Sequence, residues 1–290
     1  MAFSLDNDMT EETSTTINEI LQKVVVELRT CSCIQGIVLG GSRATGTADE
    51  HSDIDIGIYY DRFHYEDLNR IASRLDDTHR HDLICREGEW GHWVNCGGWL
   101  TIEGVSVDLI FRDCARVRDI LRTSDEGHFS AHYQTGHPHA YLDIMYRGEL
   151  ASSRVLYAAT QDFTDMKRHA EEYPKALQMS LMQFFSFEAG FSCDLAEASV
   201  ENGDICYMAG HLFRALSALH QVLFAWNKKW CLNEKKAVWR IELFPAAPPD
   251  YAKKVAAIWK NFSPSPAQAV QDLRMLREEV EDIIGRKNQE

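Results

Sequence analysis

Two aspartates separated by one residue stand in an apolar segment, and a third aspartate follows about fifty residues later. Asp53 and Asp55 alternate with isoleucines in DIDIGIY, and Asp108 stands in the alternating segment VSVDLIF. Because successive strand residues face opposite sides, both acids of the pair point away from the isoleucines, with backbones roughly 6 to 7 Å apart. Isoleucine-flanked carboxylates are expensive to desolvate without a cation. The pattern predicts that Asp53, Asp55 and Asp108 bind two Mg²⁺ ions in a phosphoryl-transfer site.

A glycine-rich turn precedes the aspartate pair. Gly40 and Gly41 end an apolar segment, and Ser42 to Gly46 is predicted to start a short helix. Such a turn presents backbone N–H groups to phosphate oxygens, while Ser42 adds a hydroxyl and Arg43 a cation. Either motif alone is more often an ordinary turn or a solvated surface. Together they predict that Gly41, Ser42 and Arg43 bind the phosphates of a nucleoside triphosphate.

The elements that must position these residues are read from hydrophobic periodicity. Beyond about Tyr157 the alternating strand pattern stops, and helical stripes begin near Asp162. Prolines in LFPAAPPD and SPSP interrupt the helices of this second half. The predicted elements of the first half are a helix near 17–28 capped by Thr13 to Thr16, strands at 34–39, 53–59 and 105–111, helices at 68–75 and 113–122, and a strand with a long loop in 79–100. The predicted helical stripes of the second half are Met208, Leu212, Ala215, Leu219, Leu223 and Trp226, and Val270, Leu273, Leu276, Val280 and Ile283.

The charge of the chain is concentrated in its first half. Residues 1–150 hold 26 acidic residues against 13 Lys and Arg, and residues 151–290 hold 18 against 17. An acidic half repels phosphate backbones, so we expect no nucleic-acid partner and favour metals and cationic small molecules. The eight cysteines lack disulfide-framework spacing, the N-terminus lacks a signal-peptide pattern, and the apolar runs are too short for a membrane span. We therefore expect a reduced, cytoplasmic protein without a membrane partner.

The combination of turn and acids resembles a known family. GGSRATGTADEHSDID, followed by a later strand with Asp108, is similar to the signature of the DNA polymerase β-like nucleotidyltransferase superfamily, in particular its small bacterial members that act on aminoglycosides and lincosamides. The resemblance implies a mixed sheet with flanking helices, in which the three aspartates hold two Mg²⁺ and Gly41 and Ser42 hold the triphosphate. One departure is that many relatives carry an arginine where this chain has Thr45.

Together these observations predict an α+β protein of two domains. Residues 1–150 are expected to form a mixed-sheet nucleotidyltransferase core with flanking helices, and residues 151–290 an all-α helical bundle that binds substrate. The active site is expected in the cleft between them.

The residues that would serve the acceptor are less clearly marked. In the aminoglycoside enzymes that the chain resembles, the general base is a carboxylate, and Glu149 at the domain junction is the first candidate, with Glu103 a weaker one. His137, His139 and Lys235 are candidates for the substrate cleft. For each of these residues an ordinary solvated or hydrogen-bonded role is the more common alternative.

Further polar and aromatic residues allow ordinary structural interpretations. Asp204 is well placed to cap the helix that begins at Ile205. A loose set of His79, His81, Cys85, His92 and Cys96 lacks the spacing of a standard zinc module. Trp226, Trp230 and Trp239 are interpreted as core residues or as residues at the lip of the cleft.

The predicted reaction is transfer of a nucleoside monophosphate, most simply AMP from Mg-ATP, to a hydroxyl of a small molecule such as an aminoglycoside, with release of pyrophosphate. One alternative is a protein adenylyltransferase that modifies Tyr, Ser or Thr of a partner. A second is an inactive nucleotide-binding regulator. Retention of Asp53, Asp55, Asp108 and the glycine turn argues against the inactive protein.

Overall fold

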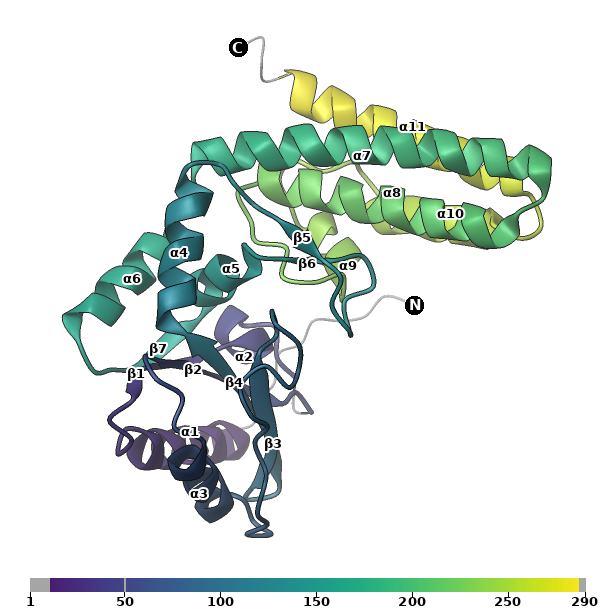
Figure 1. Cartoon of the computed structure of the whole chain (residues 1–290). Coiled ribbons are helices and arrows are strands. Elements are labelled where there is room, and N and C mark those ends of the chain that lie inside the picture. The colour runs from purple at the N-terminus through teal and green to yellow at the C-terminus, as the bar shows by residue number, and fades with distance from the viewer. Residues whose placement is uncertain (1–10, 50, 287–290) are drawn as a thin grey trace. The chain divides into compact units, whose positions relative to one another are not determined.

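A five-stranded mixed sheet forms the centre of the first of two units in the computed structural model, which describes residues 11–49 and 51–286 (Figure 1). This sheet unit comprises Met1–Arg122 with Tyr146–Glu172, and the helical unit comprises Thr123–Met145 with Tyr173–Glu290. The chain therefore crosses between the units three times, whereas a single boundary near residue 150 was predicted. The physical reason is that residues 154–158 return to the sheet and pair with its strand 34–39.

The sheet of the sheet unit has the order β3-β4-β2-β1-β7. Only the β2–β4 pair is parallel among these four neighbouring pairs, and the others are antiparallel. The elements in chain order are α1 (Glu11–Leu28), β1 (Ile34–Leu39), α2 (Gly41–Thr45), β2 (Ile54–Tyr60), α3 (Tyr65–Leu75), β3 (Cys96–Ile102), β4 (Val105–Asp113), α4 (Cys114–Asp125), α5 (Met145–Ser152), β7 (Arg154–Ala158) and α6 (Gln161–Glu171).

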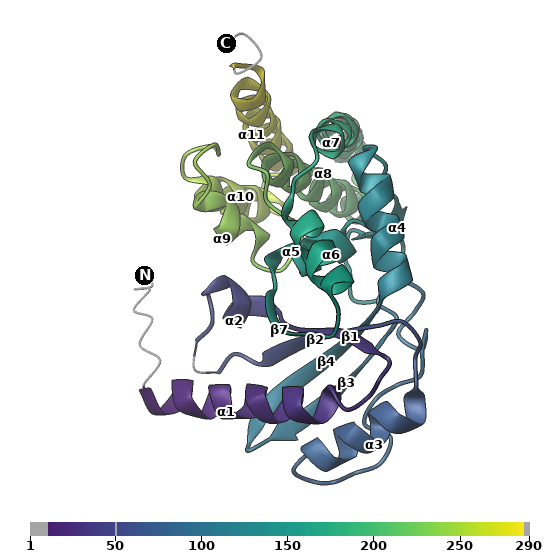
Figure 2. The same cartoon turned by 90° about the vertical axis from the view of Figure 1, so that its left-hand side faces the viewer.

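Helices cover the two faces of this sheet differently. Helices α1 and α3 lie on one side, over a core in which Ile54, Ile56 and Ile58 are fully buried (Figure 2). On the other side α6 lies so close to β1 that a Cβ at Gly36 would be 2.1 Å from the Phe163 ring. The same ring lies 5.2 Å from that of Tyr59, centroid to centroid. The apolar alternation thus selects the face that becomes the core, as predicted.

Most predicted elements of this unit are confirmed, with differences at their ends. β1 has the predicted bounds, and β2 begins at Ile54, so Asp53 lies immediately before the strand. The expected caps at Thr13 to Thr16 were wrong, because α1 runs through them. The region 79–100 contains the start of β3 after a loop joined to it by an Ile84–Gly98 bridge.

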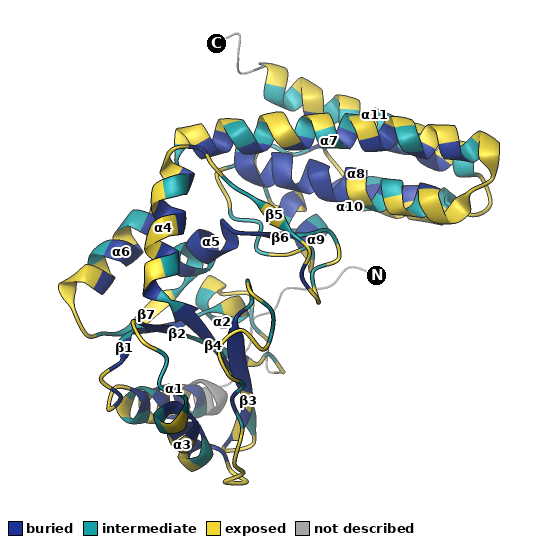
Figure 3. Ribbon diagram, in the orientation of Figure 1, coloured by how far each residue is buried: buried dark blue, intermediate teal, exposed yellow. Residues whose placement is uncertain are grey.

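The second half of the described chain is helical from Gln161 onward, as predicted, but residues 154–158 form β7 of the sheet unit, and the helical unit also includes the two-stranded β5–β6 sheet. α8 buries Met208, Leu212 and Leu219, and the long loop with three prolines separates α9 from α10. Figure 3 shows the buried faces of α7 and α8. Asp204 caps α8, as predicted, by accepting a 3.0 Å hydrogen bond from the backbone N–H of Tyr207. The elements are β5 (Ala131–His132), β6 (Tyr141–Leu142), α7 (Lys175–Asn202), α8 (Ile205–Trp226), α9 (Ala237–Glu242), α10 (Tyr251–Asn261) and α11 (Pro266–Arg286).

Two compositional predictions can be compared with the structure. All eight cysteines are free in the structure. Within the described part of the chain, every helix is too short or too polar to cross a bilayer.

Candidate functional site

Asp55 and Asp108 lie side by side on neighbouring strands. They are register partners in the parallel β2–β4 pair, and partners in a ladder project from the same face of the sheet. Asp53 precedes Asp55 by two residues, lies immediately before the first residue of β2 and is exposed. The face that carries them is opposite the isoleucine core. The two predicted strands therefore bring the three predicted carboxylates to one end of one face.

The electrostatics of Asp108 reflect this gathering of acids. Burial, followed by the charges of Asp55 and Asp53, raises the pKa of Asp108 from its ordinary 3.8 to about 6. Among the described residues, the carboxylate oxygens of the three do not all lie within 4.8 Å of one another. A divalent cation would relieve the mutual repulsion, so the donor set fits hard cations such as Mg²⁺.

The glycine turn is fixed directly against Asp55. The backbone N–H of Gly40 donates a 2.8 Å hydrogen bond to the carbonyl oxygen of Asp55. Gly41 has a φ of +58°, and a Cβ at this position would lie 1.8 Å from Oδ2 of Asp55. Only glycine combines this left-handed backbone with such a close approach. The first residues of α2, including the half-buried Ser42, thus lie beside the carboxylates.

Arg43 binds the segment that leads into the aspartates. Its Nε donates to the carbonyl of Asp53 at 3.2 Å, and its Nη2 donates to the carbonyl of Ser52. These bonds fasten α2 to the start of β2. They give Arg43 a positioning role, and its predicted contact with phosphate stays a prediction.

Glu149 lies on α5 and forms a bidentate ion pair with Arg112 of β4. Its two oxygens accept hydrogen bonds of 2.7 Å from Nε and 2.9 Å from Nη2. The arginine side chain is only 4% exposed, and its Nη1 donates to the carbonyl of Val94 at 2.8 Å. Since both oxygens of Glu149 are engaged by a buried guanidinium, the geometry favours a structural role over the predicted role as general base.

The two roles of Glu149 give different results on substitution. We expect Glu149→Ala to lower the free energy of unfolding by about 2 to 3 kcal/mol, because it removes the carboxylate from a buried guanidinium. Glu149→Gln should leave kcat/KM of the folded enzyme within a few-fold, whereas loss of a general base lowers it by roughly 10²-fold or more. Chemical denaturation and pyrophosphate release measure the two quantities. Asp119→Ala, which breaks an exposed pair with Arg122, is the control and should change stability by less than about 1 kcal/mol.

The predicted substrate-cleft residues all lie in the helical unit. The backbone N–H of His139 donates to Oε1 of Glu234 at 2.8 Å, and the ring of His137 lies 4.9 Å from that of Tyr141. Burial, followed by the charge of Arg214, lowers the pKa of His139. Lys235 is exposed. The roles of His137, His139 and Lys235 stay predictions.

The structure places three other residues that the sequence analysis discussed. Cys85, from the loose set of histidines and cysteines, accepts a 3.1 Å hydrogen bond at its sulfur from the backbone N–H of Gly97. Trp230 stacks on Tyr173 at a centroid distance of 4.4 Å. Trp239 was predicted to lie in the core or at the lip of a cleft, but it is 64% exposed, so the core alternative was wrong.

An aromatic pair beside the carboxylates was missed from the sequence. Trp99 of β3 is the register partner of Asp108 and therefore shares its face, and it is 63% exposed. The Trp90 ring lies 4.5 Å from that of Trp99 and rests on Gly97, where a Cβ would be 2.2 Å from a ring carbon. The sequence signal that could have indicated this pair is the alternation in β3, where Trp99 and Thr101 are exposed and their neighbours Leu100 and Ile102 are buried. Across this face the order is Gly41, Asp55, Asp108, Trp99.

Comparison with known proteins gives a family match for the part of the chain that contains β1 to β4. Residues 18–126 match the family described as a nucleotidyltransferase domain. A search of curated proteins gives no significant match.

Solved structures give distant likenesses. One is a nucleotidyltransferase-like protein from Exiguobacterium sibiricum, with 10% identity, coverage of 93% of this chain and 75% of that chain, and a TM-score of 0.42. A STING-associated CdnE c-di-GMP synthase from Capnocytophaga granulosa has 14% identity, coverage of 97% and 83%, and a TM-score of 0.29. The CdnE cyclic dinucleotide synthase from Elizabethkingia meningoseptica, solved with GTP and Apcpp, has 10% identity, coverage of 92% of each chain and a TM-score of 0.26. With TM-scores below 0.5, these likenesses carry no argument about substrate.

Proposed function

Because residues 18–126 form a nucleotidyltransferase domain of the DNA polymerase β-like superfamily, we propose that this enzyme transfers AMP from Mg-ATP to a hydroxyl of a small molecule and releases pyrophosphate. The observation that carries the proposal is the register of Asp55 with Asp108, next to a glycine turn in contact with Asp55. This arrangement supports the proposal that a site for metal ions and a site for phosphates adjoin on one face of the sheet. The specific nucleotide and the acceptor are parts of this proposal.

The carboxylates divide the work of holding the metal. Asp53, Asp55 and Asp108 are the residues that would hold the two Mg²⁺ ions. When bound, the ions supply positive charge that activates the attacking oxygen and neutralises the triphosphate and the leaving pyrophosphate. The raised pKa of Asp108 supports this assignment, because it marks a cluster of acids that a cation stabilises.

The glycine turn and Asp108 act on opposite sides of the reacting phosphorus. Backbone N–H groups at Gly41 and Ser42, with the Ser42 hydroxyl, hold the β- and γ-phosphates. Arg43 fixes the turn and contributes positive charge. Asp108 accepts a hydrogen bond from the acceptor hydroxyl and orients its oxygen. That oxygen bonds to the α-phosphorus as the bond to the bridging oxygen breaks, and its proton passes to Asp108 or to water.

The aromatic pair supports a ring-bearing acceptor. An in-line displacement places the attacking oxygen opposite the leaving pyrophosphate. If Gly41 holds the pyrophosphate, the acceptor enters from the other side of the carboxylates, where Trp99 and Trp90 lie. Indole faces bind flat rings and attract cations, and the acidic sheet unit favours a cationic compound. An aminoglycoside-like amino sugar is cationic, and its rings are saturated chairs whose apolar C–H faces can pack against an indole.

Trp99→Ala is therefore expected to raise KM for the acceptor by roughly 10-fold, in line with about 1 to 2 kcal/mol for a cation–π or stacking contact, with KM for ATP unchanged. Initial rates of pyrophosphate release with each substrate varied in turn measure both constants. Trp239→Ala is the control, because Trp239 is 64% exposed against 63% for Trp99. A rise in KM for ATP alone would assign the pair to the nucleotide instead.

The direct test of the proposed function is incubation of the protein with Mg²⁺, each of the four nucleoside triphosphates and a panel of amino sugars, nucleosides and neutral sugars. We expect pyrophosphate and a nucleotidylated product with ATP and a cationic hydroxyl compound. Absence of product with every cationic compound would remove that acceptor class. Label transfer from ATP to a protein in a lysate would support a protein adenylyltransferase instead.

A further inference from the structure

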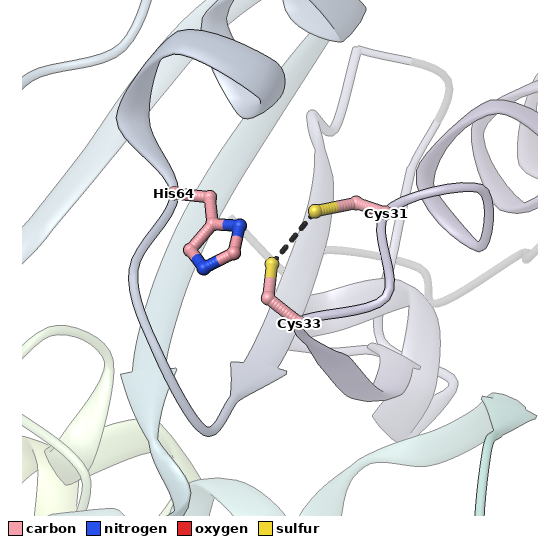
Figure 4. A group of neighbouring side chains, drawn as sticks. All are labelled: Cys31, Cys33 and His64. Atoms are coloured by element: carbon pink, nitrogen blue, oxygen red, sulfur yellow. Dashed lines mark hydrogen bonds between the residues drawn. The ribbon is translucent and has the colours of Figure 1, made fainter.

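A second group of ligand atoms lies at the opposite end of β1 and β2 from the carboxylates. Cys31 and Cys33 belong to the connection between α1 and β1, and His64 precedes α3 (Figure 4). One donor atom from each of the three lies within 4.8 Å of the others, and the two sulfurs are 2.7 Å apart. Both cysteines are buried. Donor atoms around a tetrahedral metal are separated by about 3 to 4 Å, so the three are already gathered at the scale of one site.

The backbone holds the three ligands in place. The N–H of Cys31 donates to the carbonyl of Leu28 at 3.0 Å, so the turn is anchored to the last residue of α1. The carbonyl of Cys33 accepts a 3.1 Å hydrogen bond from Asp61, which follows β2. His64 is anchored in turn, because its carbonyl accepts from Leu68 on α3 at 3.0 Å. The ligands are therefore presented by rigid elements, as a preorganised metal site requires.

We propose that Cys31, Cys33 and His64 bind one thiophilic metal ion, Zn²⁺ by preference, with water in the fourth position. Two thiolates and an imidazole are ligands that Zn²⁺ prefers. The oxygen ligands of the carboxylate site instead favour hard cations such as Mg²⁺. Two sulfurs bound to a tetrahedral zinc lie about 3.8 Å apart, so binding separates this pair by about 1 Å. Two thiolate charges neutralise the ion, which makes the buried position favourable.

A cavity borders the cluster. It measures about 210 Å³ and is lined by Cys31 and Asp67, together with Arg70 and Arg74, so it reaches one of the three proposed ligands. Oδ2 of Asp67 lies 3.8 Å from Nδ1 of His64, which is too long for a hydrogen bond but places a carboxylate beside the ring. Burial, followed by the contact with Cys31, raises the pKa of Cys33 to about 12. Because zinc binds the thiolate form, binding at Cys33 releases the proton of this thiol.

The position keeps the ion away from the transfer reaction, although a site with three protein ligands and water differs from the closed four-ligand sets of most structural zinc sites. Ile34 pairs with Tyr60 at this end of the β1–β2 ladder, and Leu39 pairs with Ile56 at the other. Five strand residues separate the ends, or about 17 Å, so the ion does not touch the reacting groups. It ties the α1–β1 connection to the β2–α3 connection and stabilises the sheet unit. This inference is independent of the proposed transferase reaction.

The experiment titrates the reduced protein with Co²⁺ and then with Zn²⁺. Thiolate-to-cobalt charge-transfer absorption reports sulfur ligands, so it distinguishes this site from Asp53, Asp55 and Asp108. We expect one equivalent of Co²⁺ with this absorption, displaced by one equivalent of Zn²⁺, and a higher Tm with Zn²⁺. Cys31→Ala with Cys33→Ala should abolish the absorption, and His64→Ala should weaken binding by more than the roughly 10- to 100-fold typical of losing a second-shell partner.

A matched variant and two contrary results complete the test. Cys114→Ala removes another buried thiol of the sheet unit and should bind the metal as the wild type does. No thiolate absorption in the reduced wild type, whose fold is confirmed by circular dichroism, would overturn the proposal. The proposal would also be overturned if the native protein contained a Cys31–Cys33 disulfide and took up no zinc after this disulfide was reduced. Thiol titration detects the disulfide, and mass spectrometry detects bound zinc.

Discussion

Asp55→Asn is expected to lower kcat/KM for nucleotidyl transfer by on the order of 10²- to 10³-fold, the range seen when a preorganised electrostatic contact to the transition state is removed. The substitution preserves the shape of the side chain. It removes the charge of Asp55, which lies against Gly41 of the glycine turn and is the strand partner of Asp108. Pyrophosphate release at saturating Mg²⁺ measures the effect, and a rise in the Mg²⁺ concentration needed for half activity should accompany it.

The control for this prediction is an aspartate just after the same strand. Asp61 follows β2 at the end far from the glycine turn, and it is exposed. Asp61→Asn should leave kcat/KM within about 2-fold, because exposed charges at this distance are screened by solvent. The double variant Asp53→Asn, Asp55→Asn should have no measurable turnover. Full turnover by the double variant would overturn the proposed mechanism.

The part of the site that lies within one segment of sequence could be predicted. Alternation in DIDIGIY identified the buried isoleucines and the opposite face for Asp55, and the structure buries all three isoleucines fully. The glycine pair marked a sharp turn, and Gly41 does adopt a positive φ. These signals are local, because strand periodicity and glycine conformation depend on neighbouring residues in the chain.

The contacts between distant segments could not be predicted. Glu149 and Arg112 are 37 positions apart, and nothing in the sequence near either residue indicates the other. The register that places Trp99 beside Asp108 depends on strand pairing, which a sequence pattern does not fix. Cys31 and Cys33 were recognised only as cysteines without a disulfide spacing, because His64 approaches them through the β1–β2 pairing.

The division of the chain into units depends on strand pairing between distant segments. A single boundary near residue 150 assumes that the chain leaves the first unit once, but β7 gains backbone hydrogen bonds by returning to the edge of the sheet at β1. Paired strand edges are favoured over exposed ones, and this preference acts between segments more than a hundred residues apart. Local sequence therefore predicts the chemistry of the site more completely than the limits of its domain.

Asp108→Asn is expected to stabilise the metal-free protein at neutral pH while it lowers kcat by roughly 10²-fold or more through loss of the group that orients the acceptor hydroxyl. The pKa of Asp108 is about 6 in the folded protein against 3.8 ordinarily. Between these values the unfolded chain has released the proton that the folded protein still holds, so stability falls as the pH rises through this window. Asparagine carries no charge and escapes this loss.

Thermal unfolding without metal at pH 4 and at pH 7.5 measures the effect. The difference in Tm between Asp108→Asn and the wild type should be larger at pH 7.5, where the wild-type carboxylate is charged beside Asp55 and Asp53. Added Mg²⁺ should raise Tm of the wild type more than that of the variant, because the ion offsets the repulsion. Asp61→Asn should show neither the pH-dependent difference nor the altered response to Mg²⁺. If Asp108→Asn were equally stabilising at both pH values, the charge of the buried Asp108 carboxylate beside Asp55 and Asp53 would not be its cause, and the argument for a cation at this face would lose its electrostatic support.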